Sequence, residues 1–167
     1  MKIFTLGHST RSIQEFFEIL KSFKIELVID VRKFPSSKKF PWFFKENLEK
    51  ELNKNKIQYI YFPELGGYRK EGYANFAKSK EFKVAIEKLL LFIDKKNAAI
   101  LCSEFLWFRC HRRYIANYLA ELGHQVIHIF DENKIQEHKL RDEETQEKMK
   151  LVLYCDKKAR KLKLSSN

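Results

Sequence analysis

The sequence has little of three features that would assign its class directly. No apolar run approaches the roughly 18 residues that a membrane-spanning helix needs. The opening stretch, MKIFTLGHST, has too short an apolar segment for a signal peptide. The three cysteines, Cys102, Cys110 and Cys155, are too few for a disulfide framework. We therefore expect a cytoplasmic protein that neither spans a membrane nor depends on disulfides.

The composition is that of a folded protein with a strong positive charge. With 167 residues, 44% of them hydrophobic, the chain is long enough for one domain with a real core. The formal net charge of +11 at pH 7 favours an anionic partner such as nucleic acid. A surface rich in lysine and glutamate explains the same composition without such a partner. Composition leaves both interpretations open, so the positions of the charges have to decide.

Short apolar runs alternate with helical patterns along residues 1–130. Strands are predicted at 2–6, 26–32, 57–62, 98–102 and 125–130, and helices at 12–23, 44–55, 79–95 and 109–122. Ser12 and Glu15 form a capping-box pattern where the first helix starts. The alternation predicts an α/β fold, a three-layer α/β/α domain whose mostly parallel, doubly wound sheet has about five strands. Residues 131–167 are predicted to be a charged C-terminal extension with a peripheral helix at 142–153.

Chemically versatile residues gather where the predicted strands end. In open parallel sheets, ligands bind outside the carboxyl ends of the strands. The residues that follow the first four predicted strands at this edge include His8, Ser9, Arg11, Asp30, Arg32, Glu64, Gly66, Gly67, Cys102, Glu104, Cys110, His111 and Arg112. The loops at the opposite edge, such as NKNKI and LGHQ, are ordinary solvated turns. We therefore predict a single pocket at the carboxyl edge. Its members would be His8, Asp30, Arg32, Glu64, Cys102 and His111.

Four separate blocks of the sequence resemble a known family. They are TLGHSTRS, VIDVRKFP, FPELGG and LCSE…RCHRRYIANYL, the last followed by VIHI. In this order they resemble the family known as domain of unknown function 488, over roughly residues 2 to 130. The resemblance implies a compact α/β domain and supplies no reaction. The pattern is kept at Gly7, His8, Ser9, Asp30, Arg32, Pro35, Glu64, Gly66, Gly67, Cys102, Glu104, Cys110, His111 and Arg112.

Arginines stand at the start of two predicted helices. Arg112 and its neighbours open the fourth helix, and Arg11 precedes the first. Cations at these positions are unfavourable for the bare helix, because its free N–H groups already carry partial positive charge. We therefore predict that Arg11, Arg32 and Arg112 hold an anion, a phosphate above all. The alternative is that the arginines pair with carboxylates such as Asp30 and Glu104.

The cysteines beside the fourth helix allow three interpretations. Seven residues separate Cys102 from Cys110 and no Cys-x-x-Cys is present, which disfavours a zinc site. A cysteine at a strand end, such as Cys102, is typical of a small buried apolar residue. Cys110, near a helix N-terminus and beside Arg109 and Arg112, should have a lowered pKa, as nucleophilic thiols do. No metal and no cofactor is expected.

The leading functional prediction is an enzyme that acts on a nucleic acid or a nucleotide. Loops that interleave Lys and Arg with aromatic residues, such as RKFPSSKKFPWFFK, are typical of nucleic-acid grooves. The predicted reaction class is base or glycosidic-bond processing. The candidate catalytic residues are His8, Asp30, Cys102, Glu104 and His111. The candidate ligand-binding residues are Ser9, Arg11, Arg32, Glu64, Gly66, Gly67, Cys110 and Arg112.

Two alternative functions stay open on the sequence. The first is a cysteine-dependent transferase or redox protein that uses Cys102 and Cys110. The second is a nucleic-acid-binding module without catalysis. Replacing the two cysteines by serine separates the first alternative from the others. Replacing Glu104 by glutamine separates an enzyme from a binding module, if binding survives and activity does not.

Overall fold

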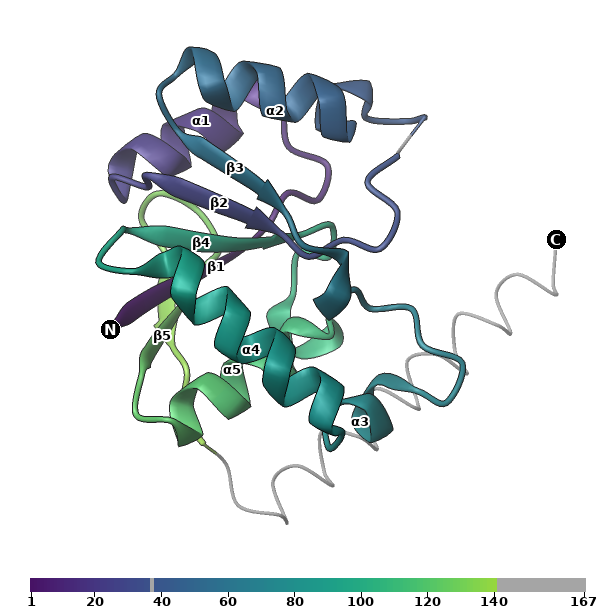
Figure 1. Ribbon diagram of the computed structural model, residues 1–167. Helices are drawn as coiled ribbons and strands as arrows, with labels where there is room; N and C mark the ends of the chain where they lie inside the picture. The colour runs from purple at the N-terminus through teal and green to yellow at the C-terminus, as the bar shows by residue number, and fades with distance from the viewer. Residues whose placement is uncertain (37, 141–167) are drawn as a thin grey trace, which may run out of the picture.

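The fold is a six-stranded sheet between two layers of helices (Figure 1). The computed structural model describes residues 1–36 and 38–140. Its strands are β1 (Lys2–Gly7), β2 (Leu27–Asp30), β3 (Gln58–Tyr61), β4 (Ala98–Cys102), β5 (Gln125–Ile129) and β6 (Ile135–Glu137), in the spatial order β3-β2-β4-β1-β5-β6. All neighbouring pairs are parallel except β5 and β6. The predicted α/β fold is confirmed.

The sheet has one strand more than the sequence predicted. The short strand β6 returns beside β5 in the antiparallel direction, so the sheet continues past residue 130. All three residues of β6 are exposed, and therefore they lack the apolar run that identifies a buried strand. The helix predicted at 142–153 and Cys155 lie outside the described residues.

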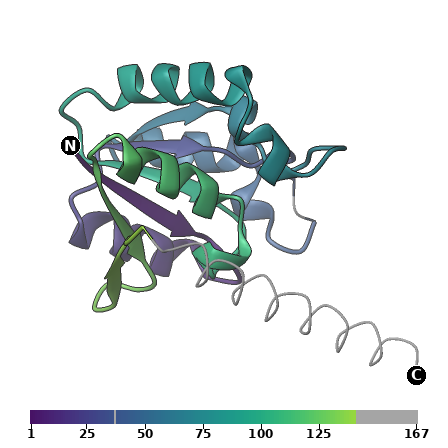
Figure 2. The same ribbon diagram turned by 90° about the horizontal axis from the view of Figure 1, so that it is seen from below.

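The helices cover both faces of the sheet. They are α1 (Ile13–Ser22), α2 (Lys45–Lys54), α3 (Tyr73–Phe76), α4 (Lys80–Ile93) and α5 (Arg112–Glu121). Helices α1 and α2 lie on one face, and α4 and α5 on the other (Figures 1 and 2). The predicted capping box is confirmed, since Ser12 and Glu15 bond each other's backbone N–H groups at the start of α1. Helix α5 begins three residues later than predicted, because Trp107–Arg109 forms a separate 3-10 turn.

The core is divided by the sheet into two parts. Because successive strand residues point to opposite faces, Ile3 and Ile100 lie in the cluster with α4 and α5. Leu6 and Leu101, in the same two strands, lie in the cluster with α1 and α2. The same alternation continues into the residues that follow the strands. It determines on which face of the sheet each polar residue at the carboxyl edge lies.

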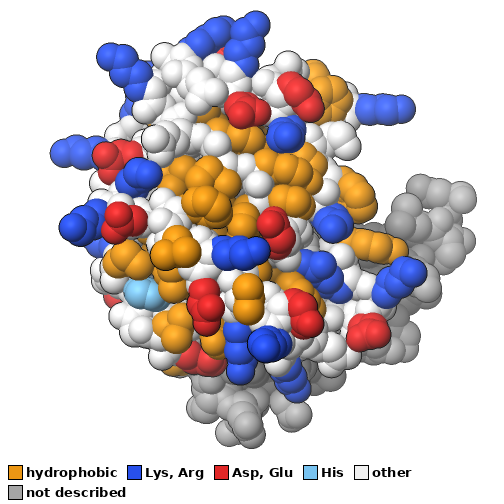
Figure 3. All heavy atoms as spheres, in the orientation of Figure 1, with side chains coloured by type: hydrophobic (Ala, Val, Ile, Leu, Met, Phe, Trp, Pro, Cys, Tyr) orange, Lys and Arg blue, Asp and Glu red, His pale blue; other side chains and the backbone are white. Residues whose placement is uncertain are grey.

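The surface carries charges of both signs. On the face shown in Figure 3, Lys and Arg side chains are interspersed with Asp and Glu around a central group of hydrophobic side chains. Exposed apolar residues of α4 include Val84, Leu91 and Phe92. No helix in residues 1–36 and 38–140 is long and apolar enough to cross a membrane.

Candidate functional site

The residues predicted to share one pocket form two clusters on opposite faces of the sheet. The carboxylate cluster comprises His8, Asp30, Arg32 and Tyr59, on the α1/α2 face. The thiol cluster comprises Cys102, Cys110, His111 and Arg112, on the α4/α5 face. The prediction of a single pocket is therefore replaced by two neighbouring sites at the same edge.

A buried ion pair forms the centre of the carboxylate cluster. The Arg32 guanidinium donates to both carboxylate oxygens of Asp30, from Nε at 2.8 and 3.0 Å and from Nη2 at 2.5 Å. Asp30 is fully buried and Arg32 is 5% exposed. The Tyr59 hydroxyl also donates to Asp30, at 2.7 Å. Burial first, and then the Asp30 charge, raise the pKa of Tyr59, so the phenol stays protonated.

His8 completes this cluster as a neutral side chain. Its ring stacks on Phe43 at 4.1 Å, and its Nδ1 lies 3.0 Å from the Ser9 carbonyl oxygen, to which it donates. Its Nε2 lies 3.2 Å from Nη1 of Arg32 and accepts from it. Burial and the nearby Arg32 charge lower the pKa of His8 to about 4. The basic nitrogen is therefore occupied by Arg32, and the catalytic role of His8 stays a prediction.

A pocket of about 390 Å³ opens beside the carboxylate cluster. It is lined by His8, Ser9, Thr10, Arg32, Phe34, Ser36, Phe40 and Ser103. Ser9 has a φ of 51°, a left-handed conformation that non-glycine residues seldom adopt outside turns and functional sites. Because Asp30 offsets the charge of Arg32, this pocket holds no uncompensated arginine for a phosphate.

The thiol cluster forms where β4 ends and α5 begins. Cys102 is the last residue of β4, and Cys110 and His111 directly precede α5. Nδ1 of His111 lies 3.6 Å from Sγ of Cys110 and 3.9 Å from Sγ of Cys102. The three ligand atoms lie within 4.8 Å of one another, so these residues are also the candidate metal donors of the described chain.

Cys110 is surrounded by hydrogen-bond donors. Its Sγ accepts from the backbone N–H of Arg112 at 3.5 Å and from Nε of Arg112 at 3.4 Å. Burial opposes ionisation of Cys110. However, hydrogen bonds from Cys102 and His111 and the charge of Arg112 outweigh burial and hold the pKa of Cys110 well below its ordinary value. The hydrogen bond to Cys110, together with burial, raises the pKa of Cys102.

Arg112 is the largest fully buried side chain in the part of the chain that the structure describes, at 1% exposure. Its guanidinium donates to the backbone carbonyls of Glu104 and Phe105 and to the Thr5 hydroxyl. No carboxylate lies within ion-pair distance of it among the residues that the structure describes. A buried charge is costly unless it is paired, so the Cys110 thiolate is the natural counter-ion of Arg112. The cluster thus holds one thiolate and one thiol.

A hydrogen-bonded chain of four residues that begins beside Arg112 was not predicted from the sequence. The Thr5 hydroxyl donates to His128 Nδ1 at 2.7 Å, and His128 Nε2 donates to His138 Nδ1 at 2.9 Å. His138 Nε2 then donates to Asn117 Oδ1 at 2.8 Å, so one set of tautomers satisfies the whole chain. The His128 ring also stacks on Trp107 at 4.1 Å. The only signal in the sequence was the two polar residues within otherwise apolar strands, which no local pattern connects to Arg112.

The other predicted site residues either bond the backbone or lie exposed on the surface. Arg11 donates to the backbone carbonyls of Gly7 and Phe130, so it joins two strand ends. Glu64 and Glu104 are exposed. Gly66 follows a 3-10 turn, Pro63–Leu65, at the end of which its N–H bonds the Pro63 carbonyl.

Gly67 lets the loop after β3 approach the thiol cluster. A Cβ at this position would lie 2.5 Å from Nδ1 of His111 and 3.1 Å from Cγ and Cε1. The G67A substitution should therefore push the imidazole away from Cys110. We expect the midpoint of the pH dependence of Cys110 alkylation by iodoacetamide to rise by about one pH unit, since one hydrogen bond to the thiolate is worth about 1.5 kcal/mol. An unchanged midpoint in a folded G67A protein would contradict the role of His111.

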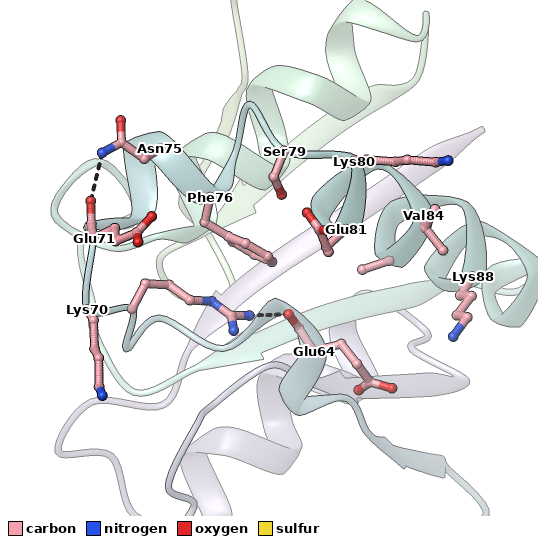
Figure 4. A pocket seen from close by; sticks show the side chains of 13 residues that line it. Glu64, Lys70, Glu71, Asn75, Phe76, Ser79, Lys80, Glu81, Val84 and Lys88 are labelled. Atoms are coloured by element: carbon pink, nitrogen blue, oxygen red, sulfur yellow. Dashed lines mark hydrogen bonds between the residues drawn. The ribbon is translucent and has the colours of Figure 1, made fainter.

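A larger groove, of about 790 Å³, shares no lining residue with either cluster. It is formed by the loop before α3 and by the first half of α4 (Figure 4). Of the predicted site residues, it contains Glu64 alone. The Arg69 guanidinium carbon lies 3.7 Å from the centre of the Phe76 ring, and Arg69 donates to the Glu64 carbonyl. The groove is therefore a space between α4 and the loop before α3, and the cysteines, histidines and buried arginines of the two clusters do not line it.

Comparison with known proteins identifies one family. The family model described as "Domain of unknown function DUF488" matches residues 12–119. No curated protein and no solved structure matches the chain. The matched range contains the whole thiol cluster, together with Asp30 and Arg32.

Proposed function

Because the chain belongs to the DUF488 family, whose description names no activity, we propose a function from the chemistry of the thiol cluster alone. The protein is a thiol–disulfide oxidoreductase in which Cys110 is the attacking sulfur and Cys102 the resolving one. The observation that supports this proposal is the fully buried guanidinium of Arg112, 3.4 Å from Cys110 and without a carboxylate partner among the described residues. A thiolate, rather than a thiol, is the nucleophile of thiol–disulfide exchange.

The first step forms a mixed disulfide. The Cys110 thiolate attacks one sulfur of a substrate disulfide, a new bond forms between the two sulfurs, and the other substrate sulfur leaves as a thiolate. In the second step Cys102 attacks Cys110. Its proton passes to the medium, the Cys102–Cys110 bond forms, and the second substrate sulfur leaves as a thiolate. Two electrons have then moved from the cysteines to the substrate.

The burial of the cluster favours a small substrate. Cys102 and Cys110 are each 6% exposed, so a sulfur must enter a narrow opening to reach them. Glutathione disulfide, a short flexible molecule, meets this requirement better than a disulfide held inside a folded protein does.

The proposal is tested by trapping the mixed disulfide. In a Cys155→Ser background, Cys102→Ser should accumulate one glutathione per chain after exposure to glutathione disulfide, and the parent should form an internal disulfide instead. Cys110→Ser should gain glutathione at least about tenfold more slowly, because Cys102 stays buried, which raises the pKa of its thiol, and receives none of the hydrogen bonds that Arg112 donates to Cys110. Intact-mass spectrometry distinguishes these products.

Two results would contradict the proposal. One is equal glutathionylation rates in the Cys102→Ser and Cys110→Ser variants. The other is stoichiometric zinc in the purified protein that the Cys110→Ser variant loses, since Cys102, Cys110 and His111 would then be metal donors. A transferase that uses Cys110 alone would form the same adduct in the parent and in the Cys102→Ser variant.

Action on a nucleic acid or nucleotide, the leading prediction from the sequence, stays a prediction. The phosphate role proposed for the three arginines receives no support from their contacts. Arg32 is paired with Asp30, and Arg11 bonds three backbone carbonyls. Arg112 bonds two other backbone carbonyls and Cys110.

A further inference from the structure

We propose that the cysteine pair is an oxidising couple, so that the protein passes its Cys102–Cys110 disulfide to dithiol substrates and returns to the reduced state. The geometry of Arg112 carries this inference, which rests on the proposed function of the pair. It assigns both the direction of electron flow and the substrate class, a molecule with two thiols that can form a disulfide.

The reduced state satisfies the buried guanidinium. Three of the four acceptors around the Arg112 guanidinium are neutral, namely the carbonyls of Glu104 and Phe105 and the Thr5 hydroxyl. Cys110 is the fourth, and it is the one among them that can carry negative charge. With Arg112 at 1% exposure, water cannot replace that charge easily. The thiolate therefore stabilises the folded protein as the counter-ion of Arg112.

Oxidation removes this charge. A Cys102–Cys110 disulfide has no thiolate, and it also ends the hydrogen bond that the Cys102 thiol donates to Cys110. Arg112 would then be a buried cation without an anion, which is strongly destabilising. The disulfide would close only the short loop of residues 102–110. Because the entropic stabilisation by a disulfide grows with the length of the closed loop, it would be small here.

The stabilisation of the reduced state by Arg112 also sets the direction of thiol–disulfide exchange. A couple whose reduced form is selectively stabilised is a strong oxidant. A substrate thiolate attacks Cys110 of the disulfide, and Cys102 leaves and takes the proton of the second substrate thiol. That second sulfur then attacks the first substrate sulfur and forms the substrate disulfide, while Cys110 leaves as a thiolate beside Arg112. The substrate loses two electrons and two protons, of which one goes to Cys102 and one to the medium.

The test is the redox equilibrium in mixtures of reduced and oxidised glutathione, measured in the full chain with Cys155→Ser. Arg112→Gln should shift the equilibrium toward the disulfide by about tenfold for each unit by which the Cys110 pKa rises. Arg113→Gln is the matched control. Arg113 bonds the Phe108 carbonyl and the Tyr114 hydroxyl and touches neither sulfur, so its loss should leave the equilibrium unchanged.

A second measurement needs no change at Arg112. The Cys155→Ser protein in its reduced form should unfold at a higher urea concentration than its oxidised form, the reverse of the usual effect of a disulfide. If the disulfide forms but is the more stable state, and Arg112→Gln leaves the equilibrium unchanged, this inference is overturned and the oxidoreductase survives. If no internal disulfide forms at any glutathione ratio, the proposed function itself fails.

Discussion

Replacing Asp30 by asparagine is expected to lower the free energy of unfolding by about 3–5 kcal/mol. Asp30 is fully buried, and its carboxylate accepts three hydrogen bonds from the Arg32 side chain and one from Tyr59. Asparagine has nearly the same shape but carries no charge. It would leave the Arg32 guanidinium buried without a counter-ion and would present an N–H₂ group to donors. Urea unfolding followed by circular dichroism measures the loss.

An exposed ion pair of the same protein provides the control. Lys54 and Glu51 lie 2.6 Å apart on α2, with side chains 57% and 40% exposed. Glu51→Gln should therefore cost no more than about 1 kcal/mol, and this cost should shrink further in salt. A loss of less than about 1 kcal/mol in Asp30→Asn would show that Arg32 does not depend on Asp30 for its charge balance.

The sheet was predictable because its signals are local. Each parallel strand is a short apolar run, and Ser12 and Glu15 mark the start of α1 by a pattern of four residues. The gathering of polar residues at one sheet edge follows from parallel topology alone. The division of these residues between two faces was missed, because it depends on which strand parity faces which pair of helices. His8 continues the parity of Leu6, and Cys102 continues that of Ile100.

The role of Arg112 was beyond the sequence for a different reason. An arginine in the first turn of a helix was interpreted as a phosphate ligand, since both the dipole and the free N–H groups favour anions there. In the structure its side chain is buried and donates to the carbonyl of Glu104, eight residues earlier. Every residue has a backbone carbonyl, so the sequence does not show which carbonyls Arg112 will bond. That depends on the path of the loop between β4 and α5. That path depends in turn on Gly7, where a Cβ would lie 1.9 Å from the Glu104 oxygen.

The second large effect expected is the ionisation of Cys110 in weakly acidic solution. An ordinary thiol, with a pKa of about 8.5, is ionised to well under 1% at about pH 6. The donors around Cys110 lower its pKa despite burial, so the thiolate should persist as the pH falls until that lower value is crossed. At a pH below both pKa values, the thiolate content of Cys110 should exceed that of an ordinary cysteine by tenfold for each unit by which its pKa is lowered.

An ultraviolet titration of thiolate absorbance tests the central claim, that Cys110 is the anion that balances Arg112, most directly. The Cys155→Ser protein is compared with Cys155→Ser/Cys110→Ser, each followed from neutral pH downward and upward. We predict that the first protein keeps one thiolate well below the ordinary thiol pKa and that the second has none there, with Cys102 ionising only in strongly alkaline solution. Two titration curves that both rise at the ordinary thiol pKa, without an acid-stable thiolate, would contradict the account.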